Sequence, residues 1–136
     1  PRNVGAIFRS AAFFGVSGVL LSHDRSAPLT EVSYDTASGG LEYVPFAFAS
    51  NLRRDLEAAR DAGVWLLGAA EEAERDAREI PRDRPWLLVV GNEESGLRRL
   101  TREICDDLRR LTPRGPVRSL NVAVATAVLL GGLSGD

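Results

Sequence analysis

The chain has 136 residues, 44% of them hydrophobic and 26% charged, which is typical of one globular domain with its own core. Its longest uncharged run, residues 119–135, holds an apolar stretch of about a dozen residues, whereas a membrane span needs roughly 20. The net charge of −2 argues against a generally basic nucleic-acid binder. With one cysteine, no Cys/His cluster and no secretory signal, we expect a cytoplasmic protein without a metal.

The basic residues are unevenly distributed. All 17 are arginines, and seven of them fall within residues 98–118, where there are only three acidic residues. The seven are Arg98, Arg99, Arg102, Arg109, Arg110, Arg114 and Arg118. Arginine favours planar, bidentate contacts with groups such as phosphate, but a solvated helix face with internal ion pairs would have the same composition. Both interpretations stay open at this point.

In chain order, the first predicted element is a helix at residues 3–14. Asn3 is a plausible N-cap for it, and Gly15 a plausible stop. The apolar run "GVLLS", residues 18–22, predicts a short buried strand. The polar segment that follows is expected to hold a short helix near residues 29–38.

The middle of the chain alternates between apolar and amphipathic segments. A strand is predicted at residues 44–49, and an amphipathic helix at residues 52–62 that ends at Gly63. The run "VWLLGA", residues 64–69, predicts a second buried strand. Residues 71–85 are charged and broken by proline, so we expect a surface connection there.

The last part of the chain predicts a strand at residues 86–91, a helix at 97–106, a short strand at 108–111 and a final helix at 119–130. The strands are continuous apolar runs that alternate with helices. This pattern is typical of an α/β fold with a mostly parallel sheet covered by helices on both faces. Ligands in such folds bind beyond the carboxyl ends of the strands, so the loops there are the candidates for a site.

One of these loops is "VVGNEESGLRRL". Gly91 permits a tight turn off the strand, and Gly96 lets the backbone approach a ligand. The sequence is neither the dinucleotide fingerprint GxGxxG nor a P-loop. Glu93 and Glu94 precede a helix start, where capping alone would account for them.

Other candidates lie near the two ends of the chain. Arg9 is charged in an apolar segment, which indicates a salt bridge, a snorkelling side chain or a guanidinium held in a cleft for phosphate or ribose. Asn121 is a good N-cap for the final helix, and Ser119 precedes it. His23 and Cys105 have no convincing partners, and we interpret both as structural.

Three separated segments resemble one family. "PRNVGAIFRSAAFFGV", "LLVVGNEESGLRRLTREICDD" and "LTPRGPVRSLNVAVATAVLL" are similar to motifs 1, 2 and 3 of the SpoU (TrmH) RNA ribose methyltransferases of the SPOUT superfamily. They occur in the family's order and spacing, and the resemblance covers essentially the whole chain. The segment "DRSAPLTEVSYDTASGGLEYVPF" also resembles the branch that methylates guanosine 2′-hydroxyls in 23S rRNA.

The resemblance implies an α/β domain with a deep C-terminal trefoil knot that binds S-adenosylmethionine, works as a homodimer and acts on RNA. The positions matching the family's cofactor site, largely through backbone, are Gly91, Leu111 and Leu120, with Asn121 beside them. The positions matching its active site are Arg9, Glu93, Ser119 and Asn121, and Asn3 matches the motif 1 asparagine. Residues 1–136 would then be the catalytic domain, without the family's first strand and any N-terminal RNA-binding domain.

The resemblance also gives these residues roles. The methyl donor is an activated sulfonium, so no metal is needed, and in-line alignment of oxygen, methyl and sulfur supplies much of the rate. Arginine is effectively always protonated, so Arg9 is expected to bind phosphate and orient the ribose hydroxyl rather than act as a base. Glu93 would fix a neighbouring Arg or Asn, while Ser119 and Asn121 would anchor the site from motif 3.

The sequence departs from the family pattern in motif 3. Leu111, Thr112 and Pro113 stand where Ile-Pro-Met is usual, and Ala123 stands where Ser is common. After Leu130 the sequence turns to "GGLSGD" where relatives continue the helix, so we expect a shortened dimer contact.

Several functions remain open from the sequence. The leading one is S-adenosylmethionine-dependent 2′-O-methylation of RNA, most simply 23S rRNA, with tRNA as the runner-up and an antibiotic-resistance methylase as a further version. A catalytically inactive RNA-binding or dimerisation module and a Rossmann-type nucleotide enzyme are the other classes. Intact Arg9, Glu93 and Asn121 count against the inactive module, and the missing GxGxxG counts against the Rossmann enzyme.

Overall fold

The computed structural model describes residues 2–22, 40–91 and 96–134. Its elements, in chain order, are α1 (Arg2–Phe13), β1 (Val19–Ser22), α3 (Gly40–Tyr43), β2 (Phe46–Ala49), α4 (Leu52–Asp61), β3 (Trp65–Ala69), β4 (Arg75–Asp76), the 3₁₀ helix η1 (Ala77–Glu79), β5 (Trp86–Val89), α5 (Arg99–Ile104), β6 (Asp107–Arg110) and α6 (Val122–Ser134). The predicted helix at residues 29–38 lies outside the described residues.

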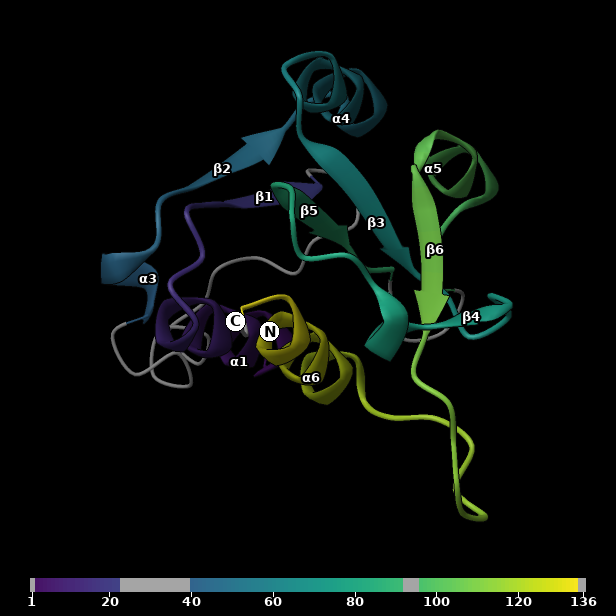
Figure 1. The fold of residues 1–136 in the computed structure, drawn as a ribbon. Coiled ribbons are helices and arrows are strands. Elements are labelled where there is room, and N and C mark those ends of the chain that lie inside the picture. The colour runs from purple at the N-terminus through teal and green to yellow at the C-terminus, as the bar shows by residue number, and fades with distance from the viewer. Residues whose placement is uncertain (1, 23–39, 92–95, 135–136) are drawn as a thin grey trace.

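All strand pairs in the described residues are parallel. β1 pairs with β2, and a second sheet has the order β4-β6-β3-β5. Figure 1 shows α4 and α5 on one side of the strands and α1 and α6 on the other. This arrangement confirms the predicted α/β fold with helices on both faces, because parallel strands need crossover connections that return over the sheet.

Two helices stop where glycine was predicted to stop them. Gly15 and Gly63 both have positive φ, at 71° and 100°, directly after α1 and α4. In each case the next residue's N–H reaches back to the last turn, from Val16 to the Ala11 carbonyl at 2.9 Å and from Val64 to the Ala59 carbonyl at 3.1 Å. These bonds satisfy carbonyls that the helix end would otherwise leave unpaired.

The helix starts agree less well with the sequence predictions. α4 is capped by Asn51, whose side chain accepts from the Arg54 N–H at 3.1 Å. The prediction that Asn3 caps α1 is wrong, because the helix begins at Arg2 and Asn3 lies within its first turn. Helix boundaries read from sequence are uncertain by a residue or two where no cap bond fixes them.

The described residues form two hydrophobic core clusters. One joins α1 to α3 through Phe8, Ala11, Leu41 and Val44. The other lies between α4, α5 and the strands and is built from Leu56, Leu66, Val89 and Ile104. Phe8, Leu56 and Leu66 are at most 1% exposed. Burying each such side chain contributes roughly 1.5–3 kcal/mol, which holds the strands in place for the loops beyond them.

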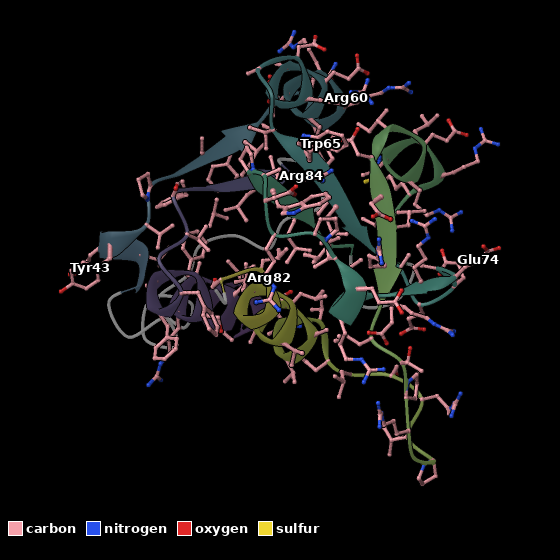
Figure 2. The ribbon with its side chains drawn as sticks, viewed as in Figure 1. Tyr43, Arg60, Trp65, Glu74, Arg82 and Arg84 are labelled. Atoms are coloured by element: carbon pink, nitrogen blue, oxygen red, sulfur yellow. The ribbon has the colours of Figure 1, made fainter. Side chains whose placement is uncertain are left out.

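The amino ends of β3 and β5 are held by aromatic rings. Trp65 and Trp86 are register partners, and their rings contact edge to face with centroids 6.2 Å apart. The Arg84 guanidinium lies 4.5 Å from the Trp65 ring centroid, and Figure 2 shows the two side chains together at this end of the sheet. Trp86 Nε1 donates to the Pro81 carbonyl at 2.7 Å, so its polar atom is satisfied within the fold.

Three details of the fold differ from the sequence predictions. Residues 71–85 were predicted as a surface connection, but they contain β4, η1 and the buried residues Ala73, Ala77 and Ile80. α3 was not predicted. α6 continues to Ser134, so the expected end of the helix at Leu130 is wrong.

None of the helices in the described ranges is long and apolar enough to cross a membrane. The trefoil knot remains a prediction from the family resemblance.

Candidate functional site

The loops that could form a site follow the carboxyl ends of the strands. β5 and β6 both run parallel to β3, so the segments after Val89 and Arg110 leave the sheet at the same edge. The segment after β3 is held there too, because the Ala70 N–H donates to the Arg109 carbonyl at 3.0 Å. Ligands of parallel α/β sheets bind at this edge, where Gly91 and Leu111 also lie.

Gly91 lies against the backbone of Gly96. A Cβ added at Gly91 would stand 2.0 Å from the Gly96 carbonyl carbon and 2.4 Å from the Leu97 nitrogen, far inside any real contact. Gly96 itself has a φ of 66°, a conformation that L side chains rarely adopt. The absence of a side chain at Gly91 therefore allows its backbone to contact that of Gly96 and Leu97. Glu93 and Glu94, within the loop after β5, lie outside the described residues.

The segment between β6 and α6 stands out from the body of the domain. Figure 1 shows it running away from the end of β6 and returning to start α6. We call residues 111–121 the β6–α6 loop; within it, residues 114–121 are all exposed. Leu120 is 52% exposed and Ser119 is also exposed, so both are open to a ligand or a partner.

Asn121 ends the β6–α6 loop and caps α6. Its side-chain oxygen accepts from the Ala123 N–H at 2.8 Å and the Val124 N–H at 3.4 Å. The predicted cap is therefore confirmed. The capping bonds use the Oδ1 atom. The Asn121 side chain is nevertheless exposed, and its amide nitrogen can still donate to a ligand.

The other end of the loop is tied down by Thr112. The Thr112 hydroxyl lies beside the Asp76 carboxylate and, with the Arg78 N–H at 2.8 Å, holds the pKa of Asp76 well below its ordinary 3.8. Thr112 is one of the positions where the sequence departs from the family's Ile-Pro-Met. Thr112 thus interacts with a residue that lies 36 positions earlier in the chain, and no local sequence pattern could have revealed this.

Arg9 lies on the exposed side of α1. Its neighbour Phe8 is 0% exposed and Ala11 is 2% exposed, whereas Arg9 is in solvent reach, so the helix is buried on one face only. α1 packs along α6, and a Cβ on Gly131 would lie 3.3 Å from the Phe14 ring. This packing brings the helix that carries Asn3 and Arg9 beside the helix that Asn121 begins.

The arginine-rich segment divides into two groups. In the first, each side chain has an acidic partner: Arg99 with Glu103, Arg102 with Glu72, and Arg109 with Asp107. In the second, Arg98, Arg110 and Arg114 form no ion pair among the described residues, and Arg118 contacts only the Gly115 carbonyl, at 3.3 Å. The interpretation as internal ion pairs therefore applies to the first group, and the second group is available for contacts with groups such as phosphate.

Arg109 is the most buried arginine of the first group. It is 4% exposed; its Nε and Nη2 donate to Asp107 Oδ2 at 3.0 and 2.9 Å, and its Nη1 donates to the Asp76 carbonyl at 3.2 Å. Arg110, the next residue, has a buried Nε without a hydrogen-bond partner in the part of the chain described. Buried donors are nearly always satisfied, so this Nε is available to a ligand acceptor.

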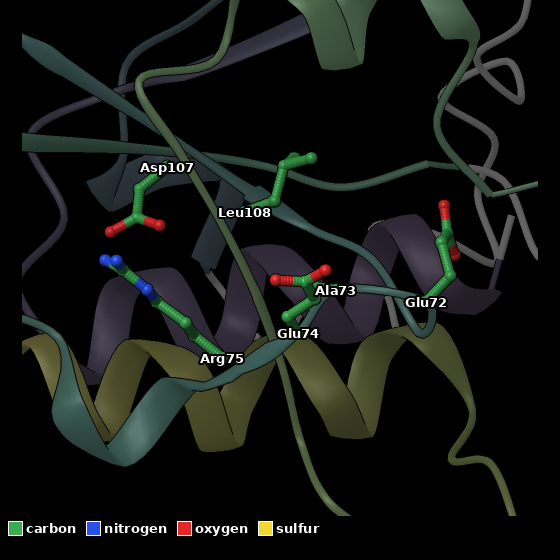
Figure 3. A pocket seen from close by; sticks show the side chains of 6 residues that line it. All are labelled: Glu72, Ala73, Glu74, Arg75, Asp107 and Leu108. Carbon is green, nitrogen blue, oxygen red and sulfur yellow. The ribbon is translucent and has the colours of Figure 1, made fainter.

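A pocket of about 310 Å³ lies elsewhere, beside β4 and β6. Figure 3 shows its lining of Glu72, Ala73, Glu74, Arg75, Asp107 and Leu108. Glu72 and Asp107 are already paired with Arg102 and Arg109. None of the predicted site residues lines this pocket, so it is separate from the candidate site.

Cys105 is structural, as predicted. Burial, with Asp106 beside it, raises the pKa of its thiol to about 11, and Sγ donates to the Thr101 carbonyl at 3.3 Å. Such a thiol is a poor nucleophile because little thiolate is present at neutral pH. No group of three potential metal ligands occurs among the residues described. His23 lies outside them.

The sequence matches the model of the SpoU rRNA Methylase family over residues 1–131. The chain belongs to this family. Two similar relatives are the 23S rRNA (guanosine-2′-O-)-methyltransferases RlmB of Photobacterium profundum and Pseudomonas aeruginosa, 42% and 43% identical over 96% of this chain. The match covers 53% and 52% of those relatives, so the chain spans about half their length.

Solved structures of the SpoU family share the fold. The methyltransferase AviRb from Streptomyces viridochromogenes, in complex with the cofactor AdoMet, superposes with a TM-score of 0.89 at 29% identity, over 98% of this chain and 55% of that one. An AdoMet-bound rRNA methyltransferase from Sinorhizobium meliloti gives 0.90 at 30% identity, over 98% and 51%. These neighbours are SPOUT methyltransferases, which agrees with the α/β fold of this SpoU chain.

Proposed function

We propose that this chain is the catalytic domain of a methyltransferase that transfers a methyl group from S-adenosylmethionine to a ribose 2′-hydroxyl of RNA. The family match over residues 1–131 carries the proposal, since it includes all three segments that hold the candidate site residues. The arrangement of those segments supports it, because two of them leave parallel strands at one edge and the helices of the first and third pack together.

The residues at this edge suit S-adenosylmethionine. Gly91 presents backbone without a side chain, Leu120 offers exposed apolar surface, and the Arg110 Nε lacks an acceptor within the described ranges. The cofactor has a flat apolar ring system and oxygen and nitrogen acceptors that match such groups. We assign Gly91, Leu111, Leu120 and Asn121 to its binding. When bound, it supplies an activated methyl group on a sulfonium.

Arg9 is the residue to which we assign the RNA side of the reaction. A guanidinium stays protonated, so it can bind the phosphate next to the target ribose and hold the 2′-hydroxyl in line with the methyl group. Its exposed position on α1 leaves it accessible to a large substrate. Asn3, on the same helix, would support this contact.

Ser119, Asn121 and Glu93 complete the assigned site. The Asn121 side chain remains exposed although its oxygen caps α6, so its amide nitrogen can donate to the ribose. Ser119 is exposed two residues earlier and can donate or accept. We assign Glu93 to fixing a neighbouring Arg or Asn side chain. In this scheme alignment, rather than a strong base, provides most of the catalysis, and the hydroxyl proton is released to solvent as the methyl group leaves the sulfonium.

The test is the variant Arg9→Ala beside Arg53→Ala, which removes an exposed arginine paired with Glu57 on the distant helix α4. Methyl transfer to RNA should fall at least about 100-fold in Arg9→Ala, a typical loss for a residue that orients the reactants, and stay unchanged in Arg53→Ala. Calorimetry should show that both variants bind S-adenosylmethionine like the wild type. Wild-type turnover by Arg9→Ala would refute the assigned role, and absence of cofactor binding by the wild type would refute the function.

We propose 23S rRNA as the substrate and the cytoplasm as the place of action, on the strength of the RlmB relatives. A TrmH/SpoU tRNA modifying enzyme from A. aeolicus also shares the fold, at 27% identity and a TM-score of 0.87, so tRNA is the alternative. Mapping 2′-O-methyl groups in both RNAs after deletion of the gene decides between them. A methyl group lost only from tRNA would contradict the rRNA proposal.

We also propose that the active form is a homodimer. Val124 and Val128 stand one turn apart on α6 and are 49% and 50% exposed, while Phe13 at the end of α1 is 82% exposed. Apolar side chains exposed together on packed helices are typical of a surface that another subunit covers. Sedimentation analysis should give twice the chain mass, and Val124→Glu/Val128→Glu should give the monomer. A monomeric wild type at micromolar concentration would contradict the proposal.

A further inference from the structure

The β6–α6 loop carries positive charge that no described residue neutralises. It contains Arg114 and Arg118 and no acidic residue. Within the described part of the chain, Arg114 forms no ion pair, and Arg118 donates to the Gly115 carbonyl of its own loop. Figure 2 shows nitrogen-tipped side chains standing out from this loop, away from the helices and strands.

The rest of the arginine-rich segment makes this exposure informative. Arg99, Arg102 and Arg109 each lie beside a carboxylate, whereas Arg114 and Arg118 form no ion pair with a described residue. Two arginines kept in solvent beside a proposed active site remain free to bind anions. Val117 lies between them in the sequence and is 73% exposed, so it presents apolar surface to a ligand on the same loop.

The loop is also anchored at both ends. Thr112 lies beside the Asp76 carboxylate at its start, and Asn121 caps α6 at its end. Anchored ends limit the conformations open to Arg114 and Arg118, which lowers the entropy lost when they bind. The anchored end also carries Ser119 and Asn121, so a ligand on the arginines would lie beside the residues assigned to the ribose.

We propose that Arg114 and Arg118 bind backbone phosphates of the RNA substrate next to the methylated nucleotide. The proposal rests on the proposed function, and it adds the β6–α6 loop as a substrate-binding element of this chain. Guanidinium groups bind phosphate oxygens bidentately, and such contacts fix the register of a nucleic acid without reading its sequence. The two arginines would therefore hold the RNA while Arg9 orients the reacting ribose.

Salt dependence provides the test. The full chain and the double variant Arg114→Gln/Arg118→Gln are titrated against a 23S rRNA transcript at several salt concentrations. Each phosphate contact contributes roughly 0.7–0.9 to the slope of log K against log salt, so the double variant should lose about 1.4–1.8. Its affinity near physiological salt should fall on the order of tenfold, with the KM for RNA raised and the KM for S-adenosylmethionine unchanged.

Two controls separate charge from damage. Arg53→Gln, which removes an exposed arginine on α4, should leave the slope unchanged. Arg114→Lys/Arg118→Lys should keep most of the slope, because lysine binds phosphate as a point charge. A purely structural role of the loop would make the Lys and Gln variants fail alike and would overturn the proposal.

The other outcomes of the titration also decide whether the proposal holds. An unchanged salt slope in the double Gln variant, with an active wild type, overturns this proposal and leaves the proposed function intact. Weaker self-association with unchanged RNA affinity makes the loop an interface between copies and overturns it as well. A wild type that binds no S-adenosylmethionine refutes the proposed function, whereas a smaller slope in the double Gln variant would still support the RNA-binding loop.

Discussion

Arg109 and Arg118 lie nine residues apart and have opposite environments. Arg109 is 4% exposed and donates to the Asp107 carboxylate and the Asp76 carbonyl. Arg118 is exposed and, among the described residues, donates a hydrogen bond to a carbonyl of its own loop. The first belongs to the frame formed by β3, β4 and β6, and the second to the β6–α6 loop. An arginine-rich stretch in a sequence is therefore not one feature, because burial decides what each guanidinium does.

This difference follows from the physical cost of burying charge. Removing the partner of a buried, ion-paired guanidinium is strongly destabilising, whereas a guanidinium in solvent contributes little to stability and can serve binding. We expect changes in the frame to affect the free energy of unfolding and changes in the loop to affect RNA binding. The following predictions test this division, from the largest expected effect to the smallest.

Arg109→Met should destabilise the fold by about 3 kcal/mol, because it leaves Asp107 without its buried partner. The matched loop variant Arg118→Met should change the free energy of unfolding by less than about 0.5 kcal/mol, as exposed substitutions usually do. Urea unfolding followed by circular dichroism measures both. Similar losses in the two variants would show that the frame and the loop do not differ as we infer.

Asn121→Ala should cost about 1 kcal/mol, because it removes the side chain that caps α6. Asn121→Asp keeps the capping oxygen and should restore most of the stability, although it loses the amide nitrogen assigned to the ribose. If Asn121→Asp recovers both stability and methyl transfer, the cap is the only function of this residue. Unfolding curves and turnover are measured on the same preparations.

Thr112→Val should raise the pKa of Asp76 toward its ordinary value, because it removes the largest of the contacts that lower that pKa. A carboxylate with a lowered pKa stabilises the fold above the unfolded value, here 3.8, and this contribution is lost as the pH falls below it. The variant should therefore lose less stability on acidification than the wild type. Unfolding between pH 5 and pH 2 checks this, and identical pH profiles would contradict it.

The smallest expected effect concerns the reactivity of the Cys105 thiol. With its pKa raised to about 11 by burial, it should react with iodoacetamide at pH 8 far more slowly in the folded protein than in urea. The raised pKa stabilises the fold below the unfolded value of 9.0, and this contribution is lost between pH 9 and 11. Equal alkylation rates in the folded and unfolded states would refute the structural assignment of this thiol.

The sequence predicted most of the strands. Those later found as β1, β3 and β5 were predicted within two residues of their ends, because continuous apolar runs bounded by polar residues are typical of parallel strands. The ends of β2 and β6 were predicted equally closely. The stops at Gly15 and Gly63 and the cap at Asn121 were also confirmed, since these signals are local. The N-cap at Asn3 and the end of α6 at Leu130 were wrong.

β4 escaped prediction because its partner strand is distant in the chain. β4 is only two charged residues long, Arg75 and Asp76, and it exists as a strand through its pairing with β6. Its carboxylate then holds Thr112, which in the sequence was only a departure from a motif. Pairings of this kind leave no periodic signal, so sequence patterns cannot reveal them.

By itself, therefore, the sequence determined the α/β class and most of the elements, because apolar runs, glycine stops and caps act over a few residues. The residues of the candidate site came from the family resemblance and stay predictions. The tertiary structure decided which arginines are neutralised and which stay in solvent, how the β6–α6 loop is anchored, and that α1 packs against α6. These features depend on groups that are far apart in the chain and meet only when the sheet is assembled.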